Sequence, residues 1–486
     1  MFQIVHNGFF ATLLPTPDAD LYEELVDNFT WVNPLDLNDA IYFYQDSDMY
    51  GGIADKLAAY LVERGYECVI LPPEHCKEYN WKFHWTYRPR QWEAVSSLLN
   101  EHRGIIKATP GAGKTAMIAS IVANLGVKAL VVCQNSKPFG QIYDTFVKST
   151  DIVPGRFGDG YKEEGDVVIA MVQSIGSALQ QGYDHPLREF IRQAKVVIVD
   201  ECHHGVADTY HSLMPHLGQL ERLYGVSATP HRDDDRHAQL EAVYGPIRYE
   251  ITYGESIEDN VSCPITVMVE DVPPRKYADL SLPVEHVIDK ETGIVTMRAK
   301  FVQPWRLQQM KRTRYAHIYQ DYIVNNVDRN TLAVRTARDA MAQGKSCAVI
   351  VGRLDHAENV KALLPEAVII TSKTKKADKA TIFEKLGRKE IMCVITTLMD
   401  EAVDVPTLSL VLLLAGGKST VKLIQRLRST RAFEGETALG YFKKTMAYAY
   451  YPIDNCDYLH GHSLSCNRLL KSVVAQSPQN RYIKLK

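Results

Sequence analysis

The stretch ATPGAGKT, at residues 108–115, decides the fold class of this 486-residue chain. It follows the apolar pair Ile105 and Ile106 and precedes AMIASIVANL, whose apolar residues recur at helical spacing. A glycine-rich turn between a strand and a helix surrounds an anion with backbone N–H groups and a helix N-terminus. The pattern therefore predicts a phosphate-binding loop, with Ala108 where the usual pattern has glycine.

The side chains of this loop suit the phosphates and the metal ion of a nucleotide. Lys114 can bring a point charge to the outer phosphates, and the Thr115 hydroxyl can ligate Mg²⁺. We expect nucleotide contacts along the whole turn, at Pro110, Gly111, Ala112, Gly113, Lys114 and Thr115. A glycine-rich turn that binds no nucleotide is the alternative, and the motifs that follow disfavour it.

VVIVDECHH, at residues 196–204, is a β-branched apolar run that ends in two carboxylates. A buried parallel strand delivers such side chains at its carboxyl edge. Asp200 is expected to hold the metal ion. Glu201 is expected to orient and deprotonate the attacking water, because that task needs a carboxylate within hydrogen-bond reach. The Cys-His-His triplet that follows does not predict zinc, since three adjacent side chains leaving a strand cannot all point at one ion.

With SATP at residues 227–230, these motifs occur in an order that resembles the superfamily 2 helicases of the DEAD/DEAH-like group. The resemblance spans roughly residues 85–470. It implies an α/β fold with two tandem RecA-like domains, in which parallel sheets are flanked by helices. It also implies that ATP and Mg²⁺ bind between the two lobes.

The resemblance assigns nucleotide contacts to further residues in both halves. It places Gln91 of TYRPRQWEAV against adenine, with Arg88 or Tyr87 beside it. CVITTLMDEAVDVPTLSLVLLL, at residues 393–414, resembles the family's T-x-x-x-x-E-G-x-D-x-P segment, which implies a nucleotide contact at Asp404.

Nucleic-acid contacts are implied where strands of the two lobes end. The residues at these places are Ser136, Lys137, Gln173, Ser174, Arg232, Arg353 and Thr397. Ser227 and Thr229 stand where the family couples hydrolysis to strand contacts.

STVKLIQRLRSTRAFEG, at residues 419–435, resembles the arginine-finger helix but departs from the pattern Q-x-x-G-R-x-x-R. From Gln425 the chain reads Q-R-L-R-S-T-R, one residue shorter and without the glycine. Arg428 and Arg431 keep the R-x-x-R spacing, so we expect them on one helical face. The finger role suits them because a guanidinium never titrates and its fork matches phosphate oxygens. A basic solvated helix face is the alternative for either arginine alone.

Length and composition fit a soluble protein of about three domains. We place an accessory domain at 1–80, the first lobe at 81–255 and the second lobe at 256–486, which includes an insertion at about 270–320 and a C-terminal tail. The nine cysteines form no C-x-x-C pair, no apolar run approaches the roughly 20 residues that span a bilayer, and the start lacks a basic leader. We therefore expect a cytoplasmic location, in the host cytoplasm if the chain is phage-encoded.

The insertion contains two patterns. VEHVIDKETGIVTM, at residues 284–297, predicts a β-hairpin, which could act as a strand-separating wedge or as a packing flap. Residues 292–320 contain six Lys or Arg and no acid, with Trp305 and Tyr315 among them. This mixture can bind phosphates and stack on a base, or it can be a solvated helix with buried aromatic rings.

The first 80 residues contain no nucleotide motif. GGIADKLAAYLVERGYECVIL, at residues 51–71, predicts a helix followed by a strand, and hence a small α/β domain. The segment weakly resembles the N-terminal domain of UvsW-type phage recombination and branch-migration helicases. Residues 1–56 contain ten Asp or Glu and one Lys, whereas residues 418–486 contain twelve Lys or Arg and four acids. Nucleic-acid binding must therefore come from local patches.

Together these features predict an ATP-dependent DNA helicase or translocase that unwinds or branch-migrates forked and junction DNA. We expect a monomer whose partner is DNA. The preference for branches rests on analogy with the UvsW-type helicases. The alternatives are an RNA helicase, a duplex DNA translocase subunit that separates no strands, and a nucleotide-gated binding module. Glu201 and the paired arginines disfavour the last.

Overall fold

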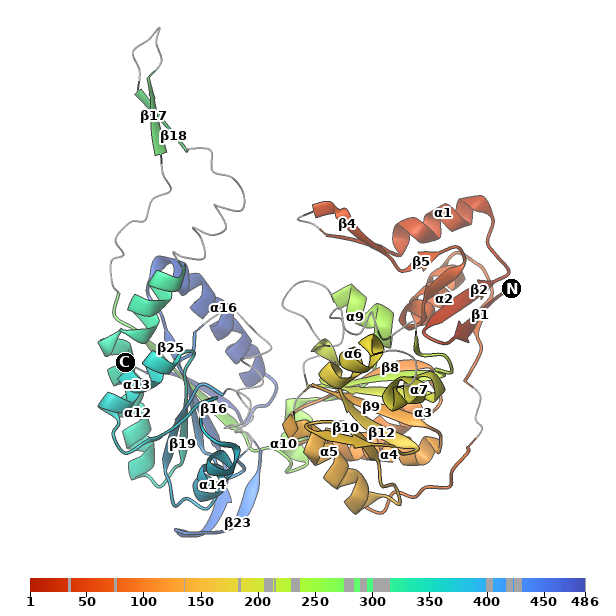
Figure 1. Ribbon diagram of the computed structural model, residues 1–486. Coiled ribbons are helices and arrows are strands. Elements are labelled where there is room, and N and C mark those ends of the chain that lie inside the picture. Colours follow the sequence, from red (N-terminus) through yellow and green to blue (C-terminus); the bar gives the residue numbers. More distant parts are fainter. Residues whose placement is uncertain are drawn as a thin grey trace. The chain divides into compact units, whose positions relative to one another are not determined.

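A computed structural model shows the fold (Figure 1). It describes the chain except for residues 34–35, 74–76, 135, 182–184, 205–212, 214–215, 229–236, 275–283, 289–294, 300–314, 399–404, 417–422, 424–430 and 486. The chain separates into two compact units, Met1–Asp259 and Asn260–Lys486. The domain limits predicted at residues 80 and 255 stay predictions.

The first unit begins with a five-stranded sheet in the order β5-β6-β2-β1-β7. Its elements are β1 (Phe2–Asn7), β2 (Phe10–Leu14), α1 (Ala19–Asn28), β5 (Tyr44–Gln45), β6 (Asp48–Tyr50), α2 (Ala54–Glu63) and β7 (Cys68–Ile70). β3 (Thr30–Asn33) and β4 (Asp36–Tyr42) form a separate hairpin. Leu57 and Leu61 of α2 pack on Ile4 and Leu13 of the sheet. The helix and strand predicted within residues 51–71 are confirmed as α2 and β7.

A second sheet in this unit has eight strands in the order β11-β10-β12-β9-β13-β14-β8-β15. The strands are β8 (Arg103–Ala108), β9 (Ala129–Cys133), β10 (Gly155–Gly158), β11 (Tyr161–Glu163), β12 (Val167–Met171), β13 (Val196–Asp200), β14 (Arg222–Ser227) and β15 (Ile247–Ile251). Every pairing is parallel except that of β10 with β11. This is the predicted RecA-like arrangement of the first lobe.

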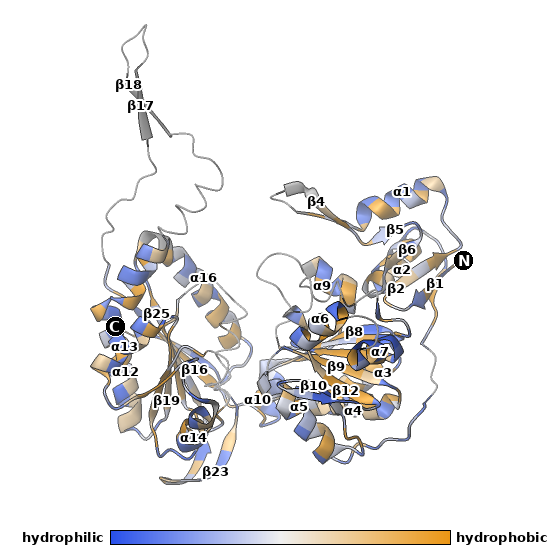
Figure 2. Ribbon diagram, viewed as in Figure 1, coloured by the Kyte–Doolittle hydropathy of each residue, from blue (hydrophilic) through white to orange (hydrophobic). Residues whose placement is uncertain are grey.

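Helices cover both faces of the eight-stranded sheet. One face packs against α3 (Gln91–Leu99), α4 (Lys114–Leu125) and α5 (Ser136–Ser149), and the other against α6 (Val172–Gln180), α7 (Pro186–Gln193) and α9 (His237–Tyr244). Figure 2 shows the central strands β8, β9 and β12 in apolar colours, as expected for strands buried on both faces. The last helix of this unit is short, α10 (Tyr253–Glu258), and begins where Thr252 and Glu255 form a capping box.

The N-terminal sheet is joined to the eight-stranded sheet by very close backbone contacts. A Cβ atom on Gly52 would lie 2.2 Å from the Glu241 carbonyl oxygen in α9, so only glycine fits there. The buried Arg103 of β8 donates from Nη2 to the Gly8 carbonyl at 2.6 Å. Arg248 of β15 bonds Asp55 of α2 at 2.7 Å. The two sheets therefore form one packed body.

The second unit is built on a seven-stranded, wholly parallel sheet in the order β20-β21-β19-β22-β25-β16-β26. Its strands are β16 (Ile265–Asp271), β19 (Cys347–Ile350), β20 (Val368–Ile370), β21 (Cys393–Thr396), β22 (Leu410–Leu413), β25 (Ala447–Ile453) and β26 (Arg481–Lys484). Its helices include α12 (Val327–Ala342), α13 (Leu354–Leu363), α14 (Lys376–Gly387) and α16 (Asp457–Val474). The second predicted lobe is thereby confirmed.

Two hairpins accompany this sheet. β17 (Val284–Ile288) and β18 (Val295–Ala299) pair antiparallel, which confirms the hairpin predicted in the insertion. Its turn, and the basic stretch at 300–314, lie outside the described residues. β23 (Phe433–Thr437) and β24 (Gly440–Lys444) form the other hairpin. Within the described part of the chain, no helix is long and apolar enough to cross a membrane.

The stability of the second unit is expected to fall in mild acid. His356 of α13 is buried, with Nε2 2.9 Å from Asn330 Oδ1. Burial, and then the charge of Arg329, lower the pKa of His356 from 6.5 to about 3, against the opposite effect of Asp355. Below pH 6.5 the unfolded chain binds a proton that the folded chain refuses. Stability is therefore lost as the pH falls from 6.5 toward 3, by about 1.4 kcal/mol per pH unit.

Urea denaturation of the second unit at pH 7.5, 6.0 and 5.0 measures this dependence. The His356→Gln variant should show a slope that is shallower by about one proton below pH 6.5. Equal slopes for the variant and the wild type would mean that His356 is not the group responsible.

Candidate nucleotide and nucleic-acid sites

Strand order brings the separate motifs of the first lobe to one edge of its sheet. β8 leads into the phosphate-binding loop, and its neighbour β14 ends at Ser227, opposite Lys107. β13 lies on the other side of β14 and ends at Asp200, opposite Val226. Because these strands are parallel, their carboxyl ends form one rim, where α/β proteins bind ligands.

The phosphate-binding loop has the backbone that its glycines predict. Gly111 and Gly113 have φ values of 92° and 85°, a region that side chains rarely enter. Gly113 caps α4, so Lys114 and Thr115 stand in the first turn of that helix. A Cβ atom on Gly113 would lie 2.3 Å from Gln91 Nε2. The loop is thus a close-fitting cradle of backbone groups at a helix N-terminus.

Gln91 ties the loop before α3 to the phosphate-binding loop. Its side chain is 4% exposed; Nε2 donates to the Ala112 carbonyl at 2.7 Å and Oε1 accepts from the Arg88 N–H at 3.0 Å. Arg88 Nη1 also donates to the Gly111 carbonyl at 3.3 Å. Both residues implied for adenine therefore also hold the phosphate cradle in shape.

Replacing Gln91 should lower kcat/KM for ATP, because Gln91 holds the phosphate-binding loop in shape. Gln91→Ala leaves the buried Ala112 carbonyl without its donor, at a cost of about 1–3 kcal/mol, so kcat/KM for ATP should fall about 5- to 150-fold. Gln91→Glu is the informative partner, because it keeps an acceptor for Arg88 but turns an oxygen toward Ala112. Steady-state kinetics should show both variants impaired. A Gln91→Glu enzyme with wild-type kcat/KM would contradict this role.

Glu201 stands at the centre of the rim and is held from two sides. Its Oε1 lies 3.6 Å from Lys114 Nζ, and its Oε2 accepts from Ser227 Oγ at 3.1 Å. The buried His203 ring lies 2.8 Å from the same serine oxygen. Glu201 itself has φ of 51°, a strained backbone of the kind found at functional sites. The structure thus brings together the three predicted residues Lys114, Glu201 and Ser227.

The donor set suits Mg²⁺·ATP. Thr115 and Asp200 supply a hydroxyl and a carboxylate, and Mg²⁺ is commonly held by one or two carboxylates together with substrate phosphates. No group of three or more His, Cys, Asp or Glu in the described part of the chain could hold a metal on its own. Asp200 also faces the end of β9, where burial first and its charge second raise the pKa of Cys133 to about 12.

The nucleic-acid residues predicted in the first lobe reach the same rim, but on helices. Ser136 begins α5, and its hydroxyl donates to Asp159 Oδ1 at 3.2 Å. Gln173 and Ser174 lie in the first turn of α6. No loop separates Gln173 and Ser174 from their strand, because α6 begins directly after β12. The side chain of Lys137, and all of Thr229 and Arg232, lie outside the described residues.

In the second lobe, Arg353 and Thr397 follow the neighbouring strands β19 and β21 at one rim. Arg353 Nη1 donates to Gln320 Oε1 at 2.6 Å. Asp404 and Arg428 lie outside the described residues.

Arg431 corrects the prediction of a helical finger. It forms an extended bridge with Ser262, just before β16, so it stands at the amino ends of the strands and not on a helix. Pairing of Ala432 N–H with the Val261 carbonyl at 3.1 Å holds it there. Its charge lies near the buried Lys444, whose pKa burial lowers to about 8.

His203 and Arg90 are residues of the first-lobe site that the motifs alone did not reveal. His203 supports Ser227 from within a 3-10 turn, Cys202–His204. Arg90 has φ of 64° and forms ion pairs with Glu255, Glu258 and Asp259, which anchors the start of α3. The DECHH string contains a weak signal for His203, but the Arg90 contacts are too distant in sequence to infer.

Comparison with known proteins agrees with this site. The family model described as "Type III restriction enzyme, res subunit" matches residues 84–232. The chain is 28% identical over 341 residues to "Putative helicase 22" of Sulfolobus islandicus filamentous virus, which covers 67% of this chain and 57% of that protein. It is 27% identical over 351 residues to "DNA 3'-5' translocase XPB2" of Sulfurisphaera tokodaii, which covers 70% and 77%. The chain thus spans little more than half of the viral relative.

The solved structure of a restriction-modification enzyme agrees with the fold. The ATP-dependent Type ISP restriction-modification enzyme LlaBIII bound to DNA aligns with 96% of this chain and 38% of its own, at 13% identity and a TM-score of 0.54. The structure of T4 UvsW aligns with 100% of this chain and 99% of its own, at 14% identity and a TM-score of 0.42. The family match and the relatives show that the chain is similar to helicases and translocases, in agreement with its resemblance to superfamily 2.

Proposed function

We propose that this chain is an ATP-dependent DNA helicase or translocase. The observation that carries the proposal is the meeting of Lys114, Glu201 and Ser227 at the rim of a RecA-like sheet. A second RecA-like lobe presents Arg353 and Thr397 at its own rim. DNA as the partner is supported by the relative named a DNA 3'-5' translocase.

The residues of the first lobe divide the hydrolytic work. Lys114 leaves Glu201 and pairs with the outer phosphates, which releases Oε1 of Glu201 to accept a proton from the attacking water. During this step Ser227 holds the other oxygen of Glu201, Oε2, in place, and His203 supports Ser227. Mg²⁺ bound at Asp200 and Thr115 would neutralise charge on the phosphates. Arg428, which the resemblance assigns to the arginine finger, would supply further positive charge to the transferred phosphoryl group.

The finer features also belong to the proposal. Movement is in the 3'-to-5' direction, which the name of the Sulfurisphaera tokodaii relative supports. The preferred substrates are forks and four-way junctions, the protein acts as a monomer, and it works in the cytoplasm, which is that of the host if the chain is phage-encoded.

Strand displacement by the pure protein tests the proposed substrate and the direction of movement. The panel contains forks, four-way junctions, plain duplex and RNA duplex, together with partial duplexes that carry a 3' or a 5' single-stranded tail. We expect ATP-dependent processing of branched DNA and of the 3'-tailed duplex. Equal activity on plain and branched DNA would remove the branch preference, and stimulation of ATPase by RNA alone would favour an RNA helicase.

Duplex translocation without strand separation is the second candidate, and the match to a restriction-enzyme subunit favours it. Displacement of a triplex-forming oligonucleotide from intact duplex detects such movement. ATP-dependent triplex displacement without unwinding of any fork would establish this candidate in place of the helicase.

A further inference from the structure

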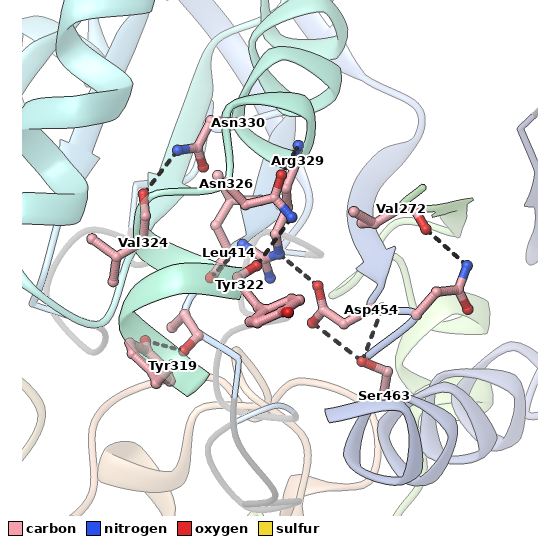
Figure 3. Close-up of polar contacts among 12 residues, drawn as sticks. Val272, Tyr319, Tyr322, Val324, Asn326, Arg329, Asn330, Leu414, Asp454 and Ser463 are labelled. Atoms are coloured by element: carbon pink, nitrogen blue, oxygen red, sulfur yellow. Dashed lines mark hydrogen bonds and ion pairs between the residues drawn. The ribbon is translucent and has the colours of Figure 1, made fainter. Parts of the chain in front are cut away.

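The carbonyl groups of Leu414 and Ala415, which follow β22, accept hydrogen bonds from side chains in the segment 319–329 of the second lobe (Figure 3). Arg329 Nη1 donates to the Leu414 carbonyl at 3.0 Å, and the Tyr319 hydroxyl donates to the Ala415 carbonyl at 2.5 Å. Gly416 follows with φ of 62° and leads into the segment that ends at Arg431. The start of the predicted finger segment is thus fixed at two adjacent points.

The same Tyr319 also contacts the loop of the predicted nucleic-acid residue Arg353. The Arg353 guanidinium carbon lies 4.7 Å from the centroid of the Tyr319 ring. A Cβ atom on Gly352 would lie 2.2 Å from the Tyr319 hydroxyl, so this loop passes directly over that oxygen. Gln320, the next residue, accepts from Arg353 Nη1 at 2.6 Å and donates to Asp355 at 2.8 Å. One tyrosine therefore touches both loops.

The segment that contacts both loops is joined to the rest of the second lobe by buried hydrogen bonds. Tyr319 precedes a π-helical turn, Gln320–Val324, a form that often occurs at functional sites. Arg329 of α12 is fully buried and bonds Asp454 at 2.8 Å, and Ser463 of α16 donates to the same carboxylate at 3.3 Å. Because the Tyr319 side chain contacts both loops, a displacement of one loop is transmitted to the other through it.

We propose that Tyr319 is a positioning residue that couples contact of nucleic acid at Arg353 to the chain that leaves β22 at Ala415 and, through it, to ATP hydrolysis. This inference rests on the proposed function. The coupling depends on the hydrogen bond from the Tyr319 hydroxyl to the Ala415 carbonyl. When Arg353 moves toward a phosphate, the Tyr319 ring moves with it and displaces the Ala415 carbonyl.

Tyr319→Phe separates the two contacts of this side chain. Phenylalanine keeps the ring that packs against Arg353 but loses the bond to Ala415. Energetic coupling between sites through such residues is typically worth about a 2- to 30-fold effect. We expect the stimulation of ATPase by DNA, measured as kcat at saturating DNA divided by kcat without DNA, to fall by a factor in that range.

The readout is a ratio because loss of folded protein lowers both rates in parallel and leaves the ratio unchanged. DNA affinity, measured by fluorescence anisotropy of a labelled oligonucleotide, should change less than about 2-fold in Tyr319→Phe. Tyr448→Phe is the matched control: it removes a hydroxyl from β25, where the ring packs under Lys345 at 4.1 Å. Its ratio should equal that of the wild type.

Arg353→Ala completes a double-mutant cycle. If the two side chains act as one path, Tyr319→Phe should add little to the loss of stimulation in the Arg353→Ala background. Additive effects, or an unchanged ratio in Tyr319→Phe alone, would overturn the coupling and leave the motor intact. A wild-type protein whose ATPase ignores DNA would overturn the proposed function, and the coupling with it.

Discussion

The Glu201→Gln variant is expected to lose ATP hydrolysis by about 10²- to 10⁴-fold in kcat while it still binds ATP. Its amide oxygen can replace the carboxylate oxygen that accepts from Ser227 at 3.1 Å. The amide cannot take a proton from water, however, so the loss falls on the chemical step. Nucleotide binding persists because the phosphate cradle and Lys114 are unchanged.

Glu250→Gln is a matched control for this experiment. Glu250 lies on β15 of the same sheet and pairs with Lys107 at 2.8 Å, so the substitution removes the partner of a lysine that has no role in the proposed hydrolysis. Its kcat should stay within about 2-fold of the wild type, since exposed ion pairs contribute little. Phosphate release and binding of a fluorescent ATP analogue measure the two steps separately. Undiminished hydrolysis in Glu201→Gln would exclude Glu201 as the base.

Asp454→Ala is expected to destabilise the second unit by about 3–5 kcal/mol. The substitution leaves the Arg329 guanidinium, which is 0% exposed, without its charged partner. Arg329 Nη2 already lacks a hydrogen-bond partner among the described residues, so the loss cannot be absorbed locally. Asp454 also accepts from Ser463, so the bond between the residue after β25 and α16 is lost as well.

Hydrogen exchange of the amides in β22 and α12 measures this loss of stability. The double variant Arg329→Met with Asp454→Leu should be more stable than Asp454→Ala, because apolar replacement of a whole buried ion pair is often close to neutral. Glu366→Ala is the control: its partner Arg338 also lies on α12, but both side chains are about half exposed, so the loss should be below about 1 kcal/mol. Equal losses in the two alanine variants would contradict the importance of burial.

The sequence was sufficient to predict features that depend on residues close to one another along the chain. The phosphate-binding loop needs glycines at fixed offsets, and the apolar run before Asp200 has the composition of a strand buried on both faces. The hairpin at 284–299 and the strands that flank the second-lobe motifs were also predicted correctly, for the same reason. Their periodicity and turn residues lie within a few positions of one another.

Features that depend on distant pairing were missed or mispredicted. Arg431 is extended because its neighbour pairs with Val261, about 170 positions away, and helical spacing contains no sign of that. Gln91 bonds Ala112 across 21 positions, and Tyr319 bonds Ala415 across 96. Such contacts are decided by strand order, so they could only be found once the sheets were assembled.

The junction at Gly52 has a consequence for how this architecture could have arisen. α9 is the helix on which that glycine rests, and it follows the stretch that leaves Ser227. A side chain of any size there would displace the N-terminal domain from α9, so a domain exchanged into this place would need an equally close-fitting backbone at the contact. The N-terminal domain and the nucleotide-binding sheet are therefore expected to change together in evolution.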